Sequence, residues 1–290
     1  MDVRRLLIFR SVLRAGSISA GARDLGWTQP AVSQHLQALE RELRTPLLLR
    51  GPRGVEPTQA GLALARHADA IAARLSDAEA EVAELKSLGV GLVRLSAFPS
   101  GAAVHVPPAL ARLAARAPGV DVRLQVEEPP EALARLRAGE CDLALVFDHP
   151  DDGPASSEAD LRSIPVVVED LVMVVPGDRR VVEGVDLSAF ADEAWIAGCV
   201  RCRQHLLVAA GRAGFAPDIR HETDDYVVVQ GMVAHGLGVA LLPRTALQAF
   251  HHPGVQVVEV VGAGRRALSL VHRLGAERVP AVAALVAAFG

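Results

Sequence analysis

The chain has little cysteine and almost no lysine. Three cysteines, Cys141, Cys199 and Cys202, occur in 290 residues. This number is too small for a scaffold held by disulfides and fits a reducing compartment. Lys86 is the only lysine, so arginine supplies nearly all of the basic charge.

Long apolar runs are also missing. The most apolar stretch, residues 226–243, is interrupted by Gln230, His235 and several glycines, so it does not predict a membrane-spanning segment. Near the N-terminus, Leu6–Phe9 lies between two arginines and is too short for the apolar core of a signal peptide. We therefore expect a cytoplasmic protein that makes no contact with a membrane.

The motifs of several enzyme classes are absent as well. The chain has no Gly-x-Ser-x-Gly, no glycine-rich phosphate loop and no His-Glu-x-x-His, the motifs typical of hydrolases, kinases and metalloproteases. Asp224 and Asp225 are adjacent, and adjacent side chains rarely face each other, so we expect them to cap a helix that starts near Tyr226. The sequence thus predicts a protein that is not an enzyme, with no catalytic residues and no cofactor.

The composition predicts a folded protein with an uneven distribution of charge. Half of the residues are hydrophobic and 22% are charged, which allows a sizeable core, and the length suggests two domains. The first 60 residues hold nine arginines and five acidic residues, whereas the rest hold 21 basic and 29 acidic residues. A basic head on an acidic body favours a polyanionic partner for the head, although arginine-rich coding would produce the same bias.

Three helices are expected in the head. Apolar spacing predicts the first over Val3–Ala15, Ser17 is a suitable N-cap for a second over Ile18–Leu25, and Thr28 is a suitable N-cap for a third. The third helix has Pro30 in its first turn, where a missing N–H costs little. One face of this helix is an apolar stripe for packing, formed by Val32, Leu36, Leu39 and Leu43.

The other face of the third helix carries small and amide side chains with no lysine or glutamate. A solvated face usually favours charges, whereas amides suit hydrogen bonding to base edges in a major groove. This face therefore favours DNA reading, and its residues are Gln29, Pro30, Ser33, Gln34 and Gln37.

A short turn rich in glycine and proline follows the third helix. It contains Arg50 and Arg53 and predicts a hairpin wing, from which an arginine can reach a phosphate or a narrow minor groove. A lone arginine in such a turn would ordinarily be only a solvated side chain.

Together these residues resemble the winged helix-turn-helix of the LysR-type transcriptional regulators. The chain departs from the family pattern at Arg44, where glycine is usual, and at Leu48, where phenylalanine is usual. Both positions lie beside the wing and not on the reading helix. The resemblance rests on Phe9, Gly16, Ser17, Ala20, Leu25, Thr28, Gln29, Pro30, Ala31, Val32, Ser33, Leu36, Leu39, Glu40, Leu43, Leu47, Arg50, Thr58, Ala60 and Gly61.

The resemblance implies a partner and a set of contact residues for the head. The partner is double-stranded operator DNA, and RNA polymerase is a further partner of such regulators. The residues expected to contact DNA are Thr28, Gln29, Pro30, Ser33, Gln34, Gln37, Arg50 and Arg53.

A narrow apolar seam follows the head. Its residues are spaced alternately four and three apart, which is the heptad pattern of paired helices. The resemblance implies a dimerisation helix here, a homodimer and a homotetramer built from two dimers. The seam consists of Leu64, Ala68, Ile71, Leu75, Ala78, Val82 and Leu85.

The remaining chain alternates between strand and helix, which predicts a parallel sheet covered by helices. We expect one helix over residues 101–117, separate strands at 164–168 and 171–175, and a strand at 255–261. The resemblance implies an α/β fold with two lobes of the periplasmic-binding-protein type. The predicted domains are a winged helix-turn-helix at 1–58, a linker helix at 59–88 and an effector domain at 89–290, with lobe I at 91–148 and 255–290 and lobe II at 160–250.

The spacing of Cys199 and Cys202 is that of a redox pair or of half a zinc site. His205 and His221 are the available further ligands, but nothing in the sequence brings them together, so we predict no metal site. We expect two ordinary cysteines after a strand, and a thiol-based redox-sensing regulator is the alternative. A solute-binding or enzymatic two-lobed module with an accessory DNA-binding head is a third hypothesis.

The resemblance also implies an effector cleft between the lobes. Ser100 follows a strand and opens a helix, Arg201 is a potential partner for a carboxylate, and Phe147 would provide an apolar wall. These features favour a small organic acid as the effector of a ligand-responsive, sequence-specific regulator. The expected contacts are Ser100, Gly101, Phe147, Cys199, Arg201 and Thr223.

Overall fold

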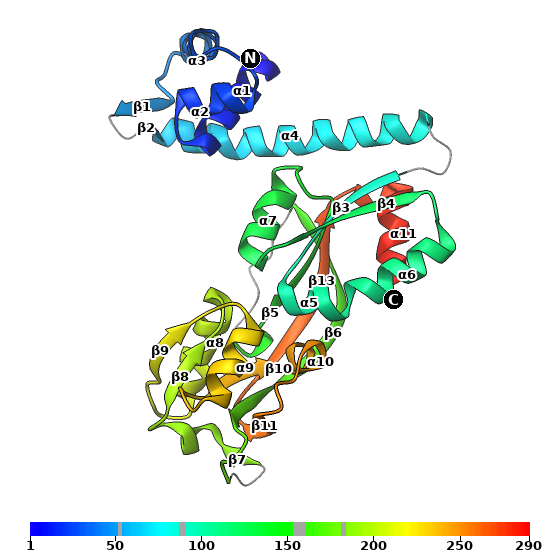
Figure 1. Cartoon of the computed structure of the whole chain (residues 1–290). Coiled ribbons are helices and arrows are strands. Elements are labelled where there is room, and N and C mark those ends of the chain that lie inside the picture. The colour runs from blue at the N-terminus through cyan, green and yellow to red at the C-terminus, as the bar shows by residue number, and fades with distance from the viewer. Residues whose placement is uncertain (52–53, 87–90, 153–159, 181–183) are drawn as a thin grey trace. The chain divides into compact units, whose positions relative to one another are not determined.

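The computed structural model describes residues 1–51, 54–86, 91–152, 160–180 and 184–290 (Figure 1). The chain forms two compact units, one of Met1–Val82 with Arg137–Glu140 and the other of Ala83–Leu136 with Cys141–Gly290. Of the helices in these ranges, none combines the length and the apolarity that a membrane span requires.

The head has the three helices and the hairpin that the sequence predicts. Helix α1 ends at Gly16, which has a left-handed backbone, and the Ser17 side chain caps α2 by accepting from the Ala20 N–H. Thr28 precedes α3 as expected, but its side chain makes no capping hydrogen bond. The elements are α1 (Val3–Ala15), α2 (Ile18–Asp24), α3 (Gln29–Leu43), β1 (Leu48–Gly51) and β2 (Gly54–Pro57).

The hairpin is anchored to the helices by side-chain and backbone bonds. The Glu40 carboxylate accepts the N–H groups of Leu47 and Leu48, at 2.8 and 3.2 Å. Leu48 is buried in the head core, so leucine fills the position where the family usually has phenylalanine. Arg44 ends α3 with φ at 53°, which explains why glycine is usual there, since glycine adopts this conformation without a steric penalty.

Helix α4 (Gln59–Lys86) spans 28 residues and is therefore about 42 Å long. The apolar seam on it divides into two parts. Leu64 packs against the head core and Ala68 is buried. Leu75 and Val82, by contrast, are 40% and 53% exposed, so the second part of the seam has an open apolar surface.

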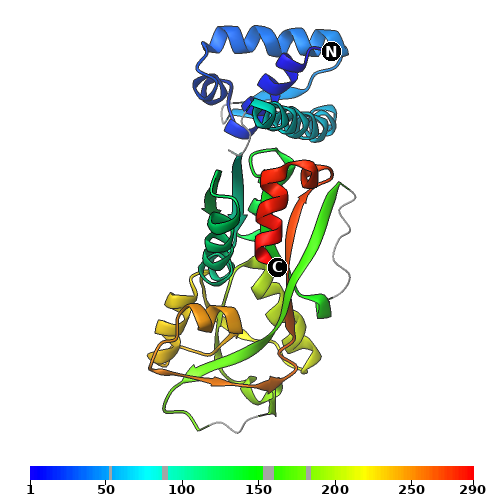
Figure 2. The ribbon, with the colours of Figure 1, turned by 90° about the vertical axis from the view of Figure 1, so that its right-hand side faces the viewer.

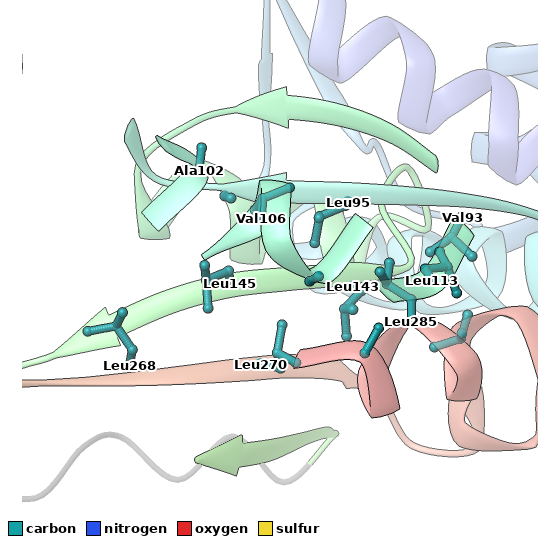
Figure 3. Close-up of a cluster of buried hydrophobic side chains, with 14 of the residues drawn as sticks. Val93, Leu95, Ala102, Val106, Leu113, Leu143, Leu145, Leu268, Leu270 and Leu285 are labelled. Atoms are coloured by element: carbon teal, nitrogen blue, oxygen red, sulfur yellow. The ribbon is translucent and has the colours of Figure 1, made fainter. Parts of the chain in front are cut away.

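Among the described residues, the second unit contains a mixed seven-stranded sheet and not a purely parallel one. Strands β3, β4 and β5 are parallel to one another, whereas β13 runs antiparallel beside β5, and β6 runs antiparallel beside β13. Helices pack against this part of the sheet and bury the cluster of hydrophobic side chains shown in Figure 3. We call this region lobe I. Its elements are β3 (Gly91–Ala97), α5 (Pro99–Val104), α6 (Val106–Arg116), β4 (Val120–Val126), α7 (Pro129–Arg137), β5 (Leu143–Asp148), β13 (Arg265–Arg273) and α11 (Pro280–Phe289).

Lobe II forms around the second half of β6 (Leu161–Pro176). There β6 pairs with two strands, β10 and β11, and a separate parallel pair, β8 with β9, packs beside them through a bridge between Trp195 and Val239. The elements are β7 (Val185–Asp186), β8 (Ala194–Ala197), α8 (Val200–Arg212), β9 (Asp218–Glu222), α9 (Tyr226–Ala234), β10 (Ala240–Pro243), α10 (Arg244–Ala249), β11 (Val255–Val258) and β12 (Val260–Val261), with 3₁₀ turns at Pro150–Asp152, Leu187–Phe190 and Ala276–Arg278.

The structure differs from the sequence predictions in three elements. The expected helix over 101–117 is two helices, because proline at 107 and 108 cannot continue a helix begun at Pro99. The two strands expected at 164–168 and 171–175 are one strand, β6, which passes from lobe I into lobe II beside β13 (Figure 2). The single strand expected at 255–261 in lobe I is two strands in lobe II, β11, which pairs with β6 between Met173 and Pro176, and β12, which pairs with β7.

Candidate operator interface and effector cavity

The outer face of α3 carries the side chains that the sequence singled out for DNA reading. Its buried residues, Val32, Leu36 and Leu39, pack into the head, which leaves the opposite face open. Ser33 is half-buried, and the exposed members of this face are Thr28, Gln29, Pro30, Gln34 and Gln37. Amide donors and acceptors are therefore presented together on one helix, as base-edge reading requires.

The wing is present, but only part of it is described. Strands β1 and β2 pair antiparallel from Leu48 with Pro57 to Gly51 with Gly54. Arg50 lies in β1, and Arg53 lies outside the described residues. Both arginines stay predictions for DNA contact.

Two adjoining cavities lie at the edge where β3, β4 and β5 end. The inner cavity has a volume of about 50 Å³ and the outer cavity about 460 Å³. Both are lined by Glu128, Gly198, Cys199, Thr223 and Asp224. The inner one is also lined by Phe98, Pro99, Ser100, Phe147, Cys202, Tyr226, Val229, Leu241, Leu242, Pro243, Ala246 and Arg266.

Arg266, on β13, is the buried cation of the inner cavity and is only 2% exposed. Its Nε and Nη2 donate to the Glu169 carboxylate at 2.9 and 2.6 Å, and Nη2 also donates to the Ser100 hydroxyl at 3.2 Å. The guanidinium lies 4.8 Å from the Phe98 ring centre and 4.7 Å from that of Phe147. These contacts hold the cation in one orientation against the cavity.

Glu128 is the acidic group shared by both cavities. It follows β4, and its Oε2 atom is buried without a hydrogen-bond partner. Burial, together with the nearby Cys199 and Asp224, raises the pKa of Glu128 to about 8, although Arg266 acts in the opposite direction. At neutral pH this carboxyl group therefore holds its proton most of the time.

The predicted effector residues are brought together only in part. Ser100, Phe147, Cys199 and Thr223 line the inner cavity. Arg201 lines the outer cavity, and its guanidinium donates to the Phe147 carbonyl at 2.8 Å and forms an ion pair with Asp148. Gly101 lines neither cavity; a Cβ there would lie 2.6 Å from the Phe98 ring, so its small size allows this ring to pack.

The two thiols of the Cys199 and Cys202 pair lie side by side. Their sulfur atoms are 3.3 Å apart, with Cys199 donating to Cys202. This hydrogen bond lowers the pKa of Cys202 and, with burial, raises that of Cys199. His205 is directed elsewhere, with its ring nitrogens 3.0 Å from Asp152 and 2.7 Å from the Ala263 carbonyl. Within the described ranges, no group of three or more His, Cys, Asp or Glu residues could hold a metal ion.

Sequence reasoning missed Arg266, Glu169 and Glu128. Arg266 and Glu169 are cross-strand partners in the register of β13 and β6, and a single sequence does not reveal which strands pair. Glu128 follows a predicted strand, as Ser100 does. The residues that follow parallel strands meet at one edge of a sheet, where ligands bind. The alternation of strand and helix could have suggested Glu128.

Comparison with protein families decides the identity of both parts. Residues 3–62 match the model of the bacterial regulatory helix-turn-helix protein of the lysR family, and residues 86–290 match the LysR substrate binding domain. The chain belongs to the LysR-type transcriptional regulator family. It is therefore a DNA-binding regulator with an effector-binding domain and not an enzyme, as the sequence predicted.

Relatives with similar sequences cover nearly the whole chain. The probable HTH-type transcriptional regulator LrrA of Synechococcus elongatus is 30% identical over 282 residues, 93% of this chain and 92% of that protein. The HTH-type transcriptional regulator YofA of Bacillus velezensis is 31% identical, over 87% and 84% of the two chains.

Solved structures share the fold at lower identity. Full-length OxyR from Pseudomonas aeruginosa has a TM-score of 0.69 at 21% identity and covers 100% of this chain and 94% of its own. Full-length CbnR in complex with its target DNA has a TM-score of 0.64 at 20% identity, covering 100% and 99%. These likenesses bear on the fold of this regulator and not on its ligand.

Proposed function

We propose that this LysR-type regulator reads an operator with the amide face of α3 and responds to a small molecule in the cavities beside Arg266. The observation that carries the proposal is the exposed, uncharged row of Gln29, Gln34 and Gln37 on a helix whose other face is buried. Regulators of this family form oligomers, and we propose a homodimer that pairs into a tetramer. It acts in the cytoplasm, where the operator is, with RNA polymerase as a further partner.

The variants Gln34→Ala and Arg53→Ala are expected to impair DNA binding in different ways. Gln34→Ala removes an amide that can read a base edge, so it should relax preference at one base position and cost about 1–3 kcal/mol. Arg53→Ala removes a phosphate contact, so it should weaken binding to every sequence and reduce the salt dependence. Titration of operator and scrambled DNA at several salt concentrations measures both effects.

The matched control is Gln204→Ala, which changes an exposed glutamine on α8 in the effector domain. It should leave DNA binding unchanged. If Gln34→Ala discriminates between operator variants as well as the unchanged protein does, α3 is not the reading helix.

A small organic acid is the proposed effector. The inner cavity combines apolar walls from Phe98 and Phe147 with one fixed positive charge on Arg266 and the Ser100 hydroxyl. A carboxylate is a strong partner for a guanidinium. Arg201 stays a proposed contact at the outer cavity, where an effector would share its guanidinium with Asp148.

A second candidate function is favoured by the distance of 3.3 Å between the two sulfur atoms. The thiolate of Cys202 could attack a peroxide and form a sulfenic acid, with release of water or an alcohol. The thiol of Cys199 would then attack that sulfur, giving a disulfide and one water molecule. Such a disulfide would link two residues that line the inner cavity at the start of α8.

Mild hydrogen peroxide tests the thiol candidate. Our expectation is that operator affinity changes by less than about twofold, because two cysteines after a strand are ordinary and burial disfavours attack. Free-thiol counting and operator titration before and after peroxide and then dithiothreitol provide the measurement. A reversible change in affinity that Cys202→Ser abolishes would establish the redox function in place of this expectation.

A further inference from the structure

The inner cavity has a basic end and an acidic end, and this pairing narrows the class of effector. The argument rests on the proposed function, since it assumes that the cavity beside Arg266 is where the effector binds. The basic end is Arg266 with Ser100, and the acidic end is Glu128 with Asp224.

The basic end holds a donor without a partner. Arg266 uses Nε and Nη2 on Glu169 and Ser100, and no described residue accepts a hydrogen bond from Nη1. Nη1 is therefore the remaining donor of a guanidinium that lines the inner cavity. A buried guanidinium with an available N–H is a strong site for a carboxylate.

The acidic end holds an acceptor without a partner. The Oε2 atom of Glu128 is buried and unpartnered, which is an unfavourable arrangement for a carboxyl group in a protein that binds nothing there. Asp224 lies near enough to raise the pKa of Glu128. A ligand ammonium would satisfy the unpartnered oxygen and offset the repulsion between the two carboxylates.

The two ends lie within reach of one small molecule. Arg266 is close enough to affect the ionisation of Glu128, and both line a cavity of about 50 Å³. The remaining walls are mostly apolar, with Phe98, Phe147 and Leu241 among them. They suit an uncharged ligand side chain, because a charge on these walls would lose its hydration without gaining a partner.

We infer that the inner cavity binds an α-amino acid with an uncharged side chain, with its carboxylate on Arg266 and Ser100 and its ammonium on Glu128 and Asp224. The outer cavity of about 460 Å³ shares Glu128 and Asp224 with it and is the route of entry. An organic acid without an amine would leave the Oε2 atom of Glu128 unpartnered.

Binding of such a ligand is coupled to a proton. The groups that face Glu128 are Cys199 before α8, Asp224 before α9 and Arg266 from β13. Because the pKa of Glu128 is raised to about 8, its carboxyl group is mainly protonated at pH 7, and an ammonium beside it expels that proton. Affinity for the amino acid should therefore rise with pH, by up to about tenfold per unit below pH 8.

The experiment uses the full chain and a defined set of probes. The twenty standard L-amino acids are screened by thermal shift. For the strongest binder, calorimetry compares the amino acid with its own desamino acid and its own decarboxylated amine. We expect both analogues to bind about tenfold to a hundredfold more weakly, and the amino acid to release a proton at pH 7, seen as a dependence of the binding heat on buffer.

Glu128→Gln isolates the acidic end. The amide keeps the shape of the side chain but removes the charge, so amino-acid affinity should fall about tenfold to a hundredfold. The same change should abolish the proton release and leave binding of the desamino acid unaltered. Glu259→Gln is the matched control, because Glu259 is exposed and lines neither cavity, and it should bind as the unchanged protein does.

Three outcomes would overturn the inference. These are no thermal shift with any of the twenty amino acids, equal affinity for the amino acid and its desamino analogue, and unchanged proton release in Glu128→Gln. Operator titration without ligand separates these failures from failure of the proposed function. A protein that binds the operator but prefers amine-free acids remains a regulator with a different effector.

Discussion

Leu75→Asp combined with Val82→Asp is expected to produce monomers that bind the operator at least a hundredfold more weakly. Both side chains are largely exposed on α4, at 40% and 53%, and they lie seven residues apart on one face. A second α4 would bury them in a coiled-coil seam. Aspartate at both positions would bury charge in that seam, which costs several kcal/mol.

Loss of operator binding follows from geometry. A helix-turn-helix monomer contacts only half of a two-fold site, so the free energy of the second head is lost on dissociation. Light scattering gives the oligomeric state and fluorescence anisotropy gives the affinity for the operator.

Val261→Asp is the matched control for this pair. Val261 is also an exposed valine, at 60%, but it lies in lobe II, so the change should alter neither oligomer nor affinity. An unchanged oligomer in the α4 variant would show that the chain pairs through a different surface.

Glu169→Ala is expected to destabilise the effector domain by about 3–5 kcal/mol, because it leaves a buried guanidinium without its counter-charge. The side chains of Arg266 and Glu169 are 3% and 8% exposed. Glu169 also accepts hydrogen bonds from the N–H and hydroxyl of Thr245, both at 2.7 Å. Its removal therefore leaves three groups without this acceptor, the guanidinium of Arg266 on β13 and the N–H and hydroxyl of Thr245 on α10.

Thermal unfolding followed by circular dichroism measures the effect, which should lower Tm by roughly 6–20 °C. The control is the double variant Glu169→Met with Arg266→Met. Replacement of a whole buried pair by apolar side chains is often neutral, so this variant should recover most of the lost stability. A single variant as stable as the unchanged protein would mean that water already solvates the pair.

Local signals were sufficient for most of the head. The spacing of apolar residues in α1 and α3, the Ser17 cap and the hairpin of β1 and β2 all depend on signals over a few residues, and each feature appears in the structure. The seam on α4 was likewise visible as a heptad. Its division into a part packed on the head at Leu64 and an open part at Val82 depends on what the helix contacts.

In the effector domain, local sequence patterns were not sufficient to predict the fold. Alternation of strand and helix predicted most elements, but it gave one helix at 101–117 where two exist and two strands where β6 is continuous. It also predicted a parallel sheet, whereas β6 and β13 pair antiparallel. Strand order and direction arise from contacts between segments far apart in the chain, and these are not encoded in local spacing.

The sequence by itself determined the family, the helix α3 and the edge of the sheet where Ser100 and Phe147 lie, because each of these rests on short-range patterns. Only the tertiary structure decided the charges of the cavity. It pairs Arg201 with Asp148, and it places Arg266 opposite Glu169 across two strands. It also places the half-buried Glu128 beside Cys199. The physical reason is that burial and ion pairing, which set the ionisation of a side chain, depend on neighbours brought together by long-range folding.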